Sequence, residues 1–264
     1  MTAKIPAENQ RLARIAPLFA GWEETMIFSC LAGCMGYAIA DDDEHPTAAQ
    51  IVVGDFCFFA GKPNEALAAQ AAAPILTPRN EAWCRVIERV WGNRVGKHTR
   101  YAIKKEPGVF DGSKLTAYAS SLPPEYTLAS IDEVIYAQAA QEKWSEDLVS
   151  QFLDGADYCL RGLGMAVLWN GQLVAGASSY TIYPGGIEIE IDTKPDYRGR
   201  GLATACGAAL ILECLRRGLY PSWDAHDLRS VALAEKLGYH MDHPLFKTLA
   251  QKKAAVWSLG SIPL

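Results

Sequence analysis

The stretch IEIEIDTKPDYRGRGLA, residues 187–203, changes character twice along its length. Isoleucines alternate with acidic residues in its first half, which is the period-two pattern of a β-strand with two different faces. Pro195 then ends the strand, because proline has no N–H group to donate to a neighbouring strand. A glycine-rich segment leads from there into an alanine-rich region. The stretch therefore predicts a strand, a turn and the start of a helix.

The turn predicts an anion-binding site. The first N–H groups of a helix have no partner within the helix, and they carry a partial positive charge. Glycines such as Gly199 and Gly201 let an anion approach the backbone closely. We therefore expect an anion at the carboxyl end of a strand that also carries three acidic side chains.

Glu188, Glu190 and Asp192 fall on one face of the predicted strand. A central strand does not ordinarily bury three acids on one face, so we expect this face to open on a cleft. A carboxylate there can accept a proton from an amine. Glu190 is the first candidate for this base and Glu188 the second. The alternative is that these acids form ion pairs with nearby arginine or lysine.

The surrounding pattern predicts a mixed sheet with helices on both faces. Asn170 and Gly171 indicate a two-residue hairpin before the 187–193 strand. A helix over residues 202–217 follows the strand, then a strand over 220–225, a helix that ends at Gly238, and one or two last strands over 240–250. Because crossover connections return in parallel, the 220–225 strand should lie parallel to the 187–193 strand. A further helix is expected to start at Ser145. The fold class is therefore α/β, with an α+β mixed sheet.

Two blocks resemble the GCN5-related N-acetyltransferases (GNATs). Residues 198–203, RGRGLA, are similar to the family fingerprint Arg/Gln-x-x-Gly-x-Gly/Ala, and residues 227–239, DLRSVALAEKLGY, are similar to its second conserved block. The resemblance covers about residues 115–250 and implies the acyl-CoA N-acyltransferase fold. Two positions depart from the family pattern. Asp227 stands where the family usually has asparagine, and Ala234 stands where it often has the tyrosine that protonates the leaving thiolate.

The resemblance divides the chain into residues 115–264, a GNAT acetyltransferase domain, and residues 1–114, an additional N-terminal α/β domain. The chain resembles a bacterial subfamily of GNATs that carries such an N-terminal extension. We expect strands over residues 26–40 and 51–60, both nearly continuous in apolar residues. The extension would serve as a lid over the acceptor, as a packing partner, or as the interface of a homodimer.

The resemblance also implies acetyl-CoA as cosubstrate. Main-chain groups of Ile191 and Thr193 would pair with its pantetheine arm. Its pyrophosphate would be held by the turn residues Arg198, Gly199, Arg200, Gly201, Leu202, Ala203 and Thr204, with the two arginines adding charge. With Ala234 in place of tyrosine, His226 is the preferred donor of a proton to the thiolate, ahead of Tyr239 and Cys206.

Composition limits the partners of the protein. The net charge is −5, and the acidic excess lies in the C-terminal part of the chain, which disfavours nucleic acid and suits an amine-bearing small molecule. Seven scattered cysteines without a CxxC pair predict reduced thiols and a cytoplasmic location. The longest apolar run is shorter than the roughly 20 residues that span a bilayer, so no membrane partner is expected. His240 and His243 lack further ligands nearby, and no metal is expected.

The sequence thus predicts an N-acetyltransferase that moves the acetyl group of acetyl-CoA directly to a primary amine of a small acceptor. Two alternatives remain open. Ala234 fits a non-catalytic protein that senses acyl-CoA, and the N-terminal extension fits a protein–protein interaction module.

Overall fold

The computed structural model describes residues 3–6 and 12–250. The chain forms two compact units, the first with Met1–Thr99 and Phe246–Leu264 and the second with Arg100–Leu245. Strands β6 (Val95–Ile103) and β13 (Met241–Ala250) carry the chain from one unit to the other and back. The second unit begins before residue 115 because the end of β6 pairs with a strand of that unit, β12 (Asp224–Ala225).

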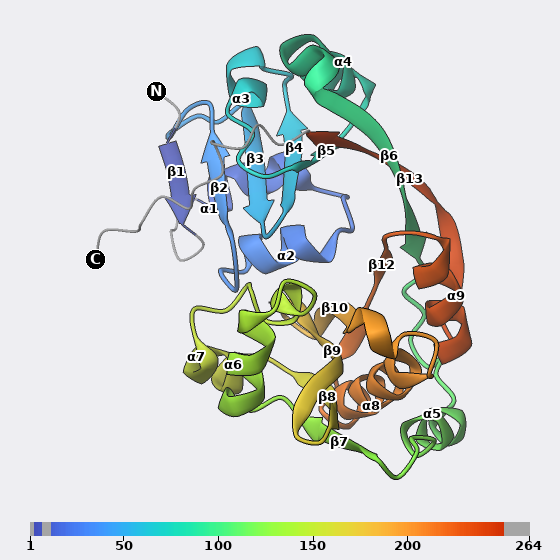
Figure 1. Ribbon diagram of the computed structural model, residues 1–264. Helices are drawn as coiled ribbons and strands as arrows, with labels where there is room; N and C mark the ends of the chain where they lie inside the picture. The colour runs from blue at the N-terminus through green and yellow to red at the C-terminus, as the bar shows by residue number, and fades with distance from the viewer. Residues whose placement is uncertain (1–2, 7–11, 251–264) are drawn as a thin grey trace. The chain divides into compact units, whose positions relative to one another are not determined.

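The first unit contains a mixed sheet with short helices (Figure 1). Its elements are β1 (Ala3–Pro6), α1 (Leu12–Ile15), η1 (Ala16–Phe19), α2 (Thr25–Leu31), β2 (Tyr37–Ala40), β3 (Ala48–Val53), β4 (Phe56–Gly61), α3 (Glu65–Ala69), β5 (Ile75–Pro78), α4 (Glu81–Trp91) and η2 (Gly92–Arg94). Strands β1 to β4 pair in order and antiparallel, whereas β5 lies parallel to β4. The carboxyl end of β13 pairs antiparallel with β5.

Two sequence predictions for this unit were wrong. Residues 26–40 form helix α2 and then strand β2 instead of one strand. Gly36, with φ +82°, separates them, and a Cβ atom there would lie 2.4 Å from the carbonyl oxygen of Val52. Residues 51–60 belong to the two strands β3 and β4, because Gly54 adopts a φ of 54° and turns the chain back.

The second unit contains a five-stranded sheet in the order β11-β10-β9-β8-β7. Besides β12 its elements are α5 (Gly112–Ala119), β7 (Tyr126–Ser130), α6 (Glu133–Gln141), η3 (Glu146–Leu148), α7 (Gly155–Arg161), β8 (Gly164–Trp169), β9 (Gln172–Tyr183), β10 (Gly186–Thr193), η4 (Pro195–Tyr197), α8 (Leu202–Arg216), β11 (Tyr220–Ser222) and α9 (Leu228–Leu237). The parallel pairing predicted around the crossover helix α8 is confirmed between β10 and β11. The hairpin is also confirmed, since Asn170 and Gly171 both have positive φ, 48° and 76°.

The two faces of this sheet carry different elements. Helix α8 packs on the face of Ile191, because a Cβ atom added to Gly207 would lie 3.1 Å from the Ile191 side chain. The short helix η3 packs on the opposite face, where a Cβ atom added to Gly176 would lie 2.7 Å from Leu148. Gly176 pairs directly with Asp192 in the ladder. The acidic face of β10 is therefore the one that η3 approaches.

The prediction of a helix that starts at Ser145 was wrong. Only residues 146–148 form a turn of 3-10 helix, and a new helix, α7, begins at Gly155. Asp154 caps it by accepting a hydrogen bond from the N–H group of Asp157 (2.8 Å). This cap ends the preceding segment, because a cap residue has an extended backbone. Leu153, which lies between η3 and α7, is 84% exposed.

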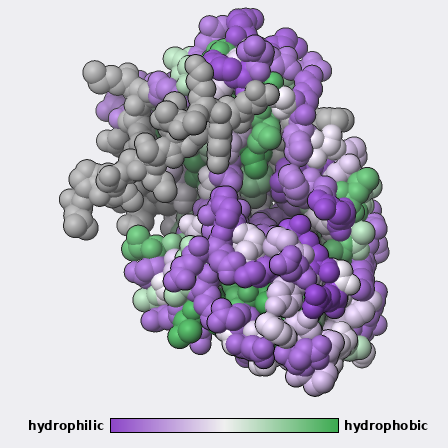
Figure 2. Space-filling model, in the orientation of Figure 1, coloured by the Kyte–Doolittle hydropathy of each residue, from purple (hydrophilic) through white to green (hydrophobic). Residues whose placement is uncertain are grey.

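The visible surface of the second unit is mainly hydrophilic, with hydrophobic patches over α6 and α7 (Figure 2). The exposed apolar side chains of that region are Val134, Leu153 and Leu160. Within the described ranges 3–6 and 12–250, no helix has both the length and the apolar character needed to cross a bilayer.

Candidate functional site

Strand β10 becomes more accessible toward its carboxyl end. Glu188 is only 5% exposed, whereas Glu190 and Asp192 are partly exposed. Glu188 pairs with Thr181 and Glu190 with Ser178 of β9. Ser178 in turn bonds to the Tyr158 hydroxyl of α7 (2.6 Å). The three acids therefore lie on the face covered by η3 and α7, and Glu190 and Asp192 are the two nearer to solvent.

Neighbouring negative charge acts on these acids. Burial raises the pKa of Glu190 to about 8, and the carboxylates of Asp192 and Asp147 add to this rise. Arg100 and a hydrogen bond from the Ile191 N–H group oppose it. Burial and Asp147 likewise raise the pKa of Asp192 to about 6. Asp147, on η3, therefore acts together with the acids of β10, and the sequence did not predict its part in this group.

Within the part of the chain that the structure describes, no strand pairs with one edge of β10, the open edge, beyond Glu188. Strand β11 pairs with β10 only from Gly186 to Glu188, and the next strand, β12, pairs with β6 instead. The N–H group of Lys194 donates to Val174 of β9 (2.9 Å). Since alternate residues of a strand direct their main-chain groups to the same side, those of Ile191 and Thr193 face the open edge. These are the two residues predicted to pair with a pantetheine arm.

The turn after β10 has the geometry of an anion site. Gly199 and Gly201 have φ values of 76° and 80°, and a Cβ atom on either would meet nothing within 4 Å. No side chain caps α8 at Gly201, and the first helical bond runs from Ala205 N–H to Gly201 oxygen (3.1 Å). The preceding N–H groups of the helix therefore lack an acceptor inside it. Those are the groups of Leu202, Ala203 and Thr204.

The two arginines of the turn already have partners. Arg198 Nε donates to the carbonyl of Thr193 at the open edge (3.2 Å). Arg200 donates to the Tyr126 hydroxyl (3.1 Å) and stacks over the ring of Tyr197. Both arginines are exposed, so their charges face solvent beside the turn.

Lys236 of α9 also reaches the first turn of α8, where its Nζ donates to Thr204 Oγ1 (3.2 Å). This lysine belongs to the second sequence block but was not among the predicted site residues. Together with the arginines, it surrounds the uncapped helix start with positive charge.

His226 lies at the point where β12 ends and is exposed. Its Nδ1 lies 3.2 Å from Nη1 of Arg100. Arg100 also bonds to the side chain of Asp224 (Nε to Oδ1, 3.1 Å) and to its carbonyl (Nη2, 3.1 Å). A guanidinium group has no acceptor, so the contact uses the lone pair of Nδ1.

The other candidate proton donors lie in the core. Cys206 is fully buried, and burial raises the pKa of its thiol to about 12. Tyr239 is 1% exposed and donates to the carbonyl of Pro221 (2.7 Å). Ala234 is also buried. Tyr239 therefore packs in the core and is not placed to donate a proton to a substrate.

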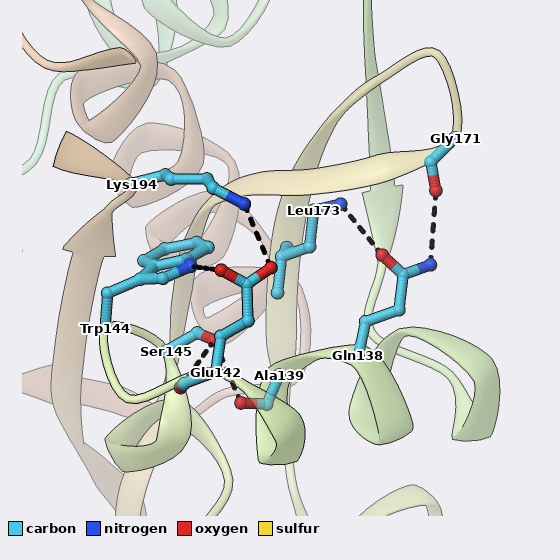
Figure 3. A network of polar contacts seen from close by, with 8 residues as sticks. All are labelled: Gln138, Ala139, Glu142, Trp144, Ser145, Gly171, Leu173 and Lys194. Atoms are coloured by element: carbon cyan, nitrogen blue, oxygen red, sulfur yellow. Dashed lines mark hydrogen bonds and ion pairs between the residues drawn. The ribbon is translucent and has the colours of Figure 1, made fainter. Parts of the chain in front are cut away.

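A polar network holds the segment that carries Asp147 (Figure 3). Glu142, after α6, accepts a hydrogen bond from Lys194 at the end of β10 (2.9 Å) and another from Trp144 (2.8 Å). On α6 itself, Gln138 accepts from the N–H group of Leu173 in β9 (2.9 Å). These contacts join α6 and the residues just after it to β9 and to the end of β10.

Across residues 3–6 and 12–250, no group of three or more histidine, cysteine or acidic side chains could hold a metal ion. His240 Nδ1 instead lies 2.7 Å from a carboxylate oxygen of Glu106, and His243 Nδ1 lies 3.1 Å from one of Asp242.

A model of the GNAT acetyltransferase family matches residues 16–246. The chain belongs to this family. The resemblance and the fold class predicted from the sequence are therefore confirmed, and membership of the GNAT family supports acyl transfer as the general activity.

Known GNAT proteins align with this chain over different lengths. The uncharacterized N-acetyltransferase YdfB of Bacillus subtilis is 30% identical over 169 residues, which cover 61% of this chain and 59% of YdfB. The chain thus matches less than two thirds of that relative's length. A crystal structure of a GCN5-related N-acetyltransferase-like protein from Streptococcus suis is 45% identical with a TM-score of 0.87, and covers 92% of this chain and 99% of that one.

A tandem GNAT protein from the clavulanic acid biosynthesis pathway matches with a TM-score of 0.55 at 12% identity, over 95% of this chain and 98% of that one. This likeness shows the fold alone. Both closer matches come from bacteria.

Sequence reasoning missed Asp147 and Arg100. Asp147 follows Ser145 and Glu146, a pattern that predicted the start of a helix, and its role depends on how η3 packs on β10. Arg100 lies 124 residues before Asp224 in the chain, and no local pattern links the two. Only the pairing of β6 with β12 brings them together.

Proposed function

We propose that this chain transfers an acetyl group from acetyl-CoA to a primary amine of a small acceptor. One observation carries the proposal: the open edge of β10 runs from the acidic face, at Glu190, toward the uncapped start of α8. A thioester bound along this edge would have its anionic end at the helix and its reactive end beside the acids. The turn at the start of α8 would bind the acyl donor, and the acidic face at Glu190 would bind the acceptor.

The acyl donor fits the turn and the open edge. The N–H groups of residues 199–204 would bind the pyrophosphate, because a helix start with nearby glycines accommodates anions. The space beside Gly199 and Gly201 leaves the backbone accessible. Main-chain groups of Ile191 and Thr193 would pair with the pantetheine arm as a strand pairs with a sheet edge.

The acidic face would bind the amine and accept a proton from it. A lysine-like amine has a pKa near 10.4, so exposing its lone pair at pH 7 costs roughly 4–5 kcal/mol. The ammonium group first releases one proton to solvent, and Glu190 takes a second proton from nitrogen as nitrogen attacks the thioester carbonyl carbon. A C–N bond forms, the C–S bond breaks, and the thiolate leaves. The high pKa of Glu190 makes it a stronger base than an exposed carboxylate.

Asp147 and Asp192 support the choice of an amine as acceptor. Both act electrostatically on Glu190, and Asp147 also acts on Asp192, so negative charge gathers on this face. Such a face attracts cations and repels anionic acceptors. Holding both substrates in line would contribute roughly 7–11 kcal/mol to catalysis, beyond the action of the base.

The test is a turnover assay with purified full-length protein, acetyl-CoA and a panel of primary amines, with free CoA followed by a thiol reagent. We expect amine-dependent CoA release well above the rate without an amine, and acetylated product by mass spectrometry. If the protein binds acetyl-CoA but releases no CoA with any amine, the transferase proposal is wrong.

A second candidate is a non-catalytic acyl-CoA sensor. It is favoured by Ala234, which replaces the tyrosine that the resemblance assigns to thiolate protonation, and which is buried in the core. Tight acetyl-CoA binding without turnover would support it.

A further inference from the structure

The carbonyl of Thr193 is a main-chain acceptor at the open edge of β10. Thr193 lies opposite Ala175 of β9. The next residue, Lys194, donates its N–H group to the carbonyl of Val174 in β9 (2.9 Å). Neighbouring residues of an antiparallel strand direct their main-chain groups to opposite sides. The Thr193 carbonyl therefore points away from β9, toward the side on which the proposed function places the pantetheine arm of the donor.

The side chain of Arg198 already occupies this position. The segment between the two residues folds as η4, where Pro195 has a restricted φ and its carbonyl accepts a hydrogen bond from the N–H group of Arg198 (3.3 Å). The turn brings the chain back toward the end of β10, and Nε of Arg198 donates to the Thr193 oxygen (3.2 Å). A chain that pairs with a strand lies about 4.8 Å from it, in the space that this guanidinium group takes. A donor arm that pairs with Thr193 must therefore displace Arg198.

The two arginines of the turn differ in how firmly they are held. Arg200 donates to the Tyr126 hydroxyl (3.1 Å) and lies over the ring of Tyr197 (5.0 Å). Within the described residues, the bond to Thr193 is the only hydrogen bond of the Arg198 side chain, which is exposed. Exposed side chains change rotamer within nanoseconds. Arg198 can therefore leave the edge more readily than Arg200 can leave its partners.

A pyrophosphate bound at the turn would give Arg198 a stronger partner than the carbonyl. Gly199 follows Arg198 directly, and the uncapped start of α8 lies three residues beyond it. A hydrogen bond from a guanidinium group to a phosphate is charge-assisted, so it is stronger than a bond to a neutral carbonyl. A donor that carries a pyrophosphate replaces the bond that it breaks. A donor that ends at the pantetheine hydroxyl leaves Arg198 with water as its partner.

We propose that Arg198 makes the donor site selective for thioesters that carry a pyrophosphate, such as acetyl-CoA, over thioesters of pantetheine alone. Its guanidinium group covers the Thr193 carbonyl in the free protein and moves to the pyrophosphate when the donor binds. Specificity is a difference between two affinities, and this contact lowers the affinity for the donor that cannot compensate for its loss. The inference rests on the proposed function, because it takes the open edge as the site of the donor arm.

The experiment measures the Kd of S-acetyl-pantetheine and of acetyl-CoA by NMR titration of the purified full-length protein, with no acceptor present. Wild type is compared with Arg198→Met, which keeps an unbranched side chain without a donor, and with Arg198→Ala, which removes the side chain beyond Cβ. Arg198 is exposed, so both variants should fold. The matched control is Arg200→Met, which removes the same charge from the turn but leaves the contact with Thr193 in place.

We expect both Arg198 variants to bind S-acetyl-pantetheine about threefold more tightly than wild type, which is the scale of one hydrogen bond. They should bind acetyl-CoA about fivefold more weakly, because the lost bond to the pyrophosphate outweighs the freed carbonyl. Unchanged or weaker binding of S-acetyl-pantetheine by the Arg198 variants overturns the inference, as does an equal gain in Arg200→Met. If acetyl-CoA binds but no amine is acetylated, the transferase proposal fails, while the two binding constants still decide the role of Arg198.

Discussion

The turn at residues 198–204 and the acidic face of β10 are neighbours in the chain, but they are built in different ways. The turn is made by the backbone itself, through the positive φ angles of Gly199 and Gly201 and the uncapped start of α8. The acidic face depends on distant segments, since η3 supplies Asp147 and β6 supplies Arg100. The comparison indicates that the proposed donor site is formed by local sequence, whereas the proposed acceptor site depends on the packing of distant segments.

The largest effect expected is on the turn. Gly201→Asp adds a Cβ atom at a φ of 80° and a negative charge at the helix start, so acetyl-CoA binding should weaken roughly a thousandfold, about 4 kcal/mol. Isothermal titration calorimetry measures it. Gly218→Asp is the matched control, because Gly218 has a φ of 70° and equally open space but follows the other end of α8. Equal binding by wild type and Gly201→Asp would contradict the assignment of the turn.

The next effect is on chemistry without loss of donor binding. Glu190→Gln keeps the shape of the side chain but cannot accept a proton, so kcat should fall roughly a hundredfold while the Kd for acetyl-CoA stays within twofold. Steady-state kinetics and calorimetry check both values. Glu235→Gln, on the exposed surface of α9, controls for the loss of one acid. A large loss in Glu188→Gln with full activity in Glu190→Gln would reverse the order of the two candidate bases.

Local residues explain which half of the site was predictable. Pro195, Gly199 and Gly201 define the end of the strand and the turn by their own backbone preferences, and a sequence displays these directly. The splitting of residues 220–225 into β11 and β12 was not predictable, because it depends on the pairing of β12 with β6. The same holds for Asp147, whose position follows from the packing of Leu148 on Gly176.

The thermal stability of the protein should fall with rising pH because Glu190 has a raised pKa in the folded state. The pKa of Glu190 is raised from 4.5 to about 8, so the folded state binds this proton more tightly than the unfolded state. Below about pH 4.5 the Glu190 carboxyl is protonated in both the folded and the unfolded state. As pH rises from there to about 8, the unfolded state loses this proton first, so the free energy of unfolding falls. Glu190→Gln should show a smaller decline in Tm over this interval by differential scanning calorimetry. Parallel Tm curves for the two proteins would mean that Glu190 is not buried among acids.

The smallest effect is expected at η3. Asp147→Asn removes a like charge that raises the pKa of both Glu190 and Asp192. The pH profile of kcat/KM should therefore move to lower pH, with little change in its maximum. Glu146→Gln is the control, since its carboxylate pairs with Lys143. A shift to higher pH in Asp147→Asn would show that Asp147 does not act on Glu190 as a negative charge.

The most direct test of the division between the two halves is the single-turnover rate of acetyl transfer at saturating acetyl-CoA and amine, measured from pH 6 to 9 in wild type and Glu190→Gln. The account predicts that the wild-type rate rises with pH through an inflection near 8, and that Glu190→Gln is slow and lacks this inflection. A Glu190→Gln protein with the same rate and the same inflection as wild type would contradict the claim that the acidic face of β10 carries out the proton transfer.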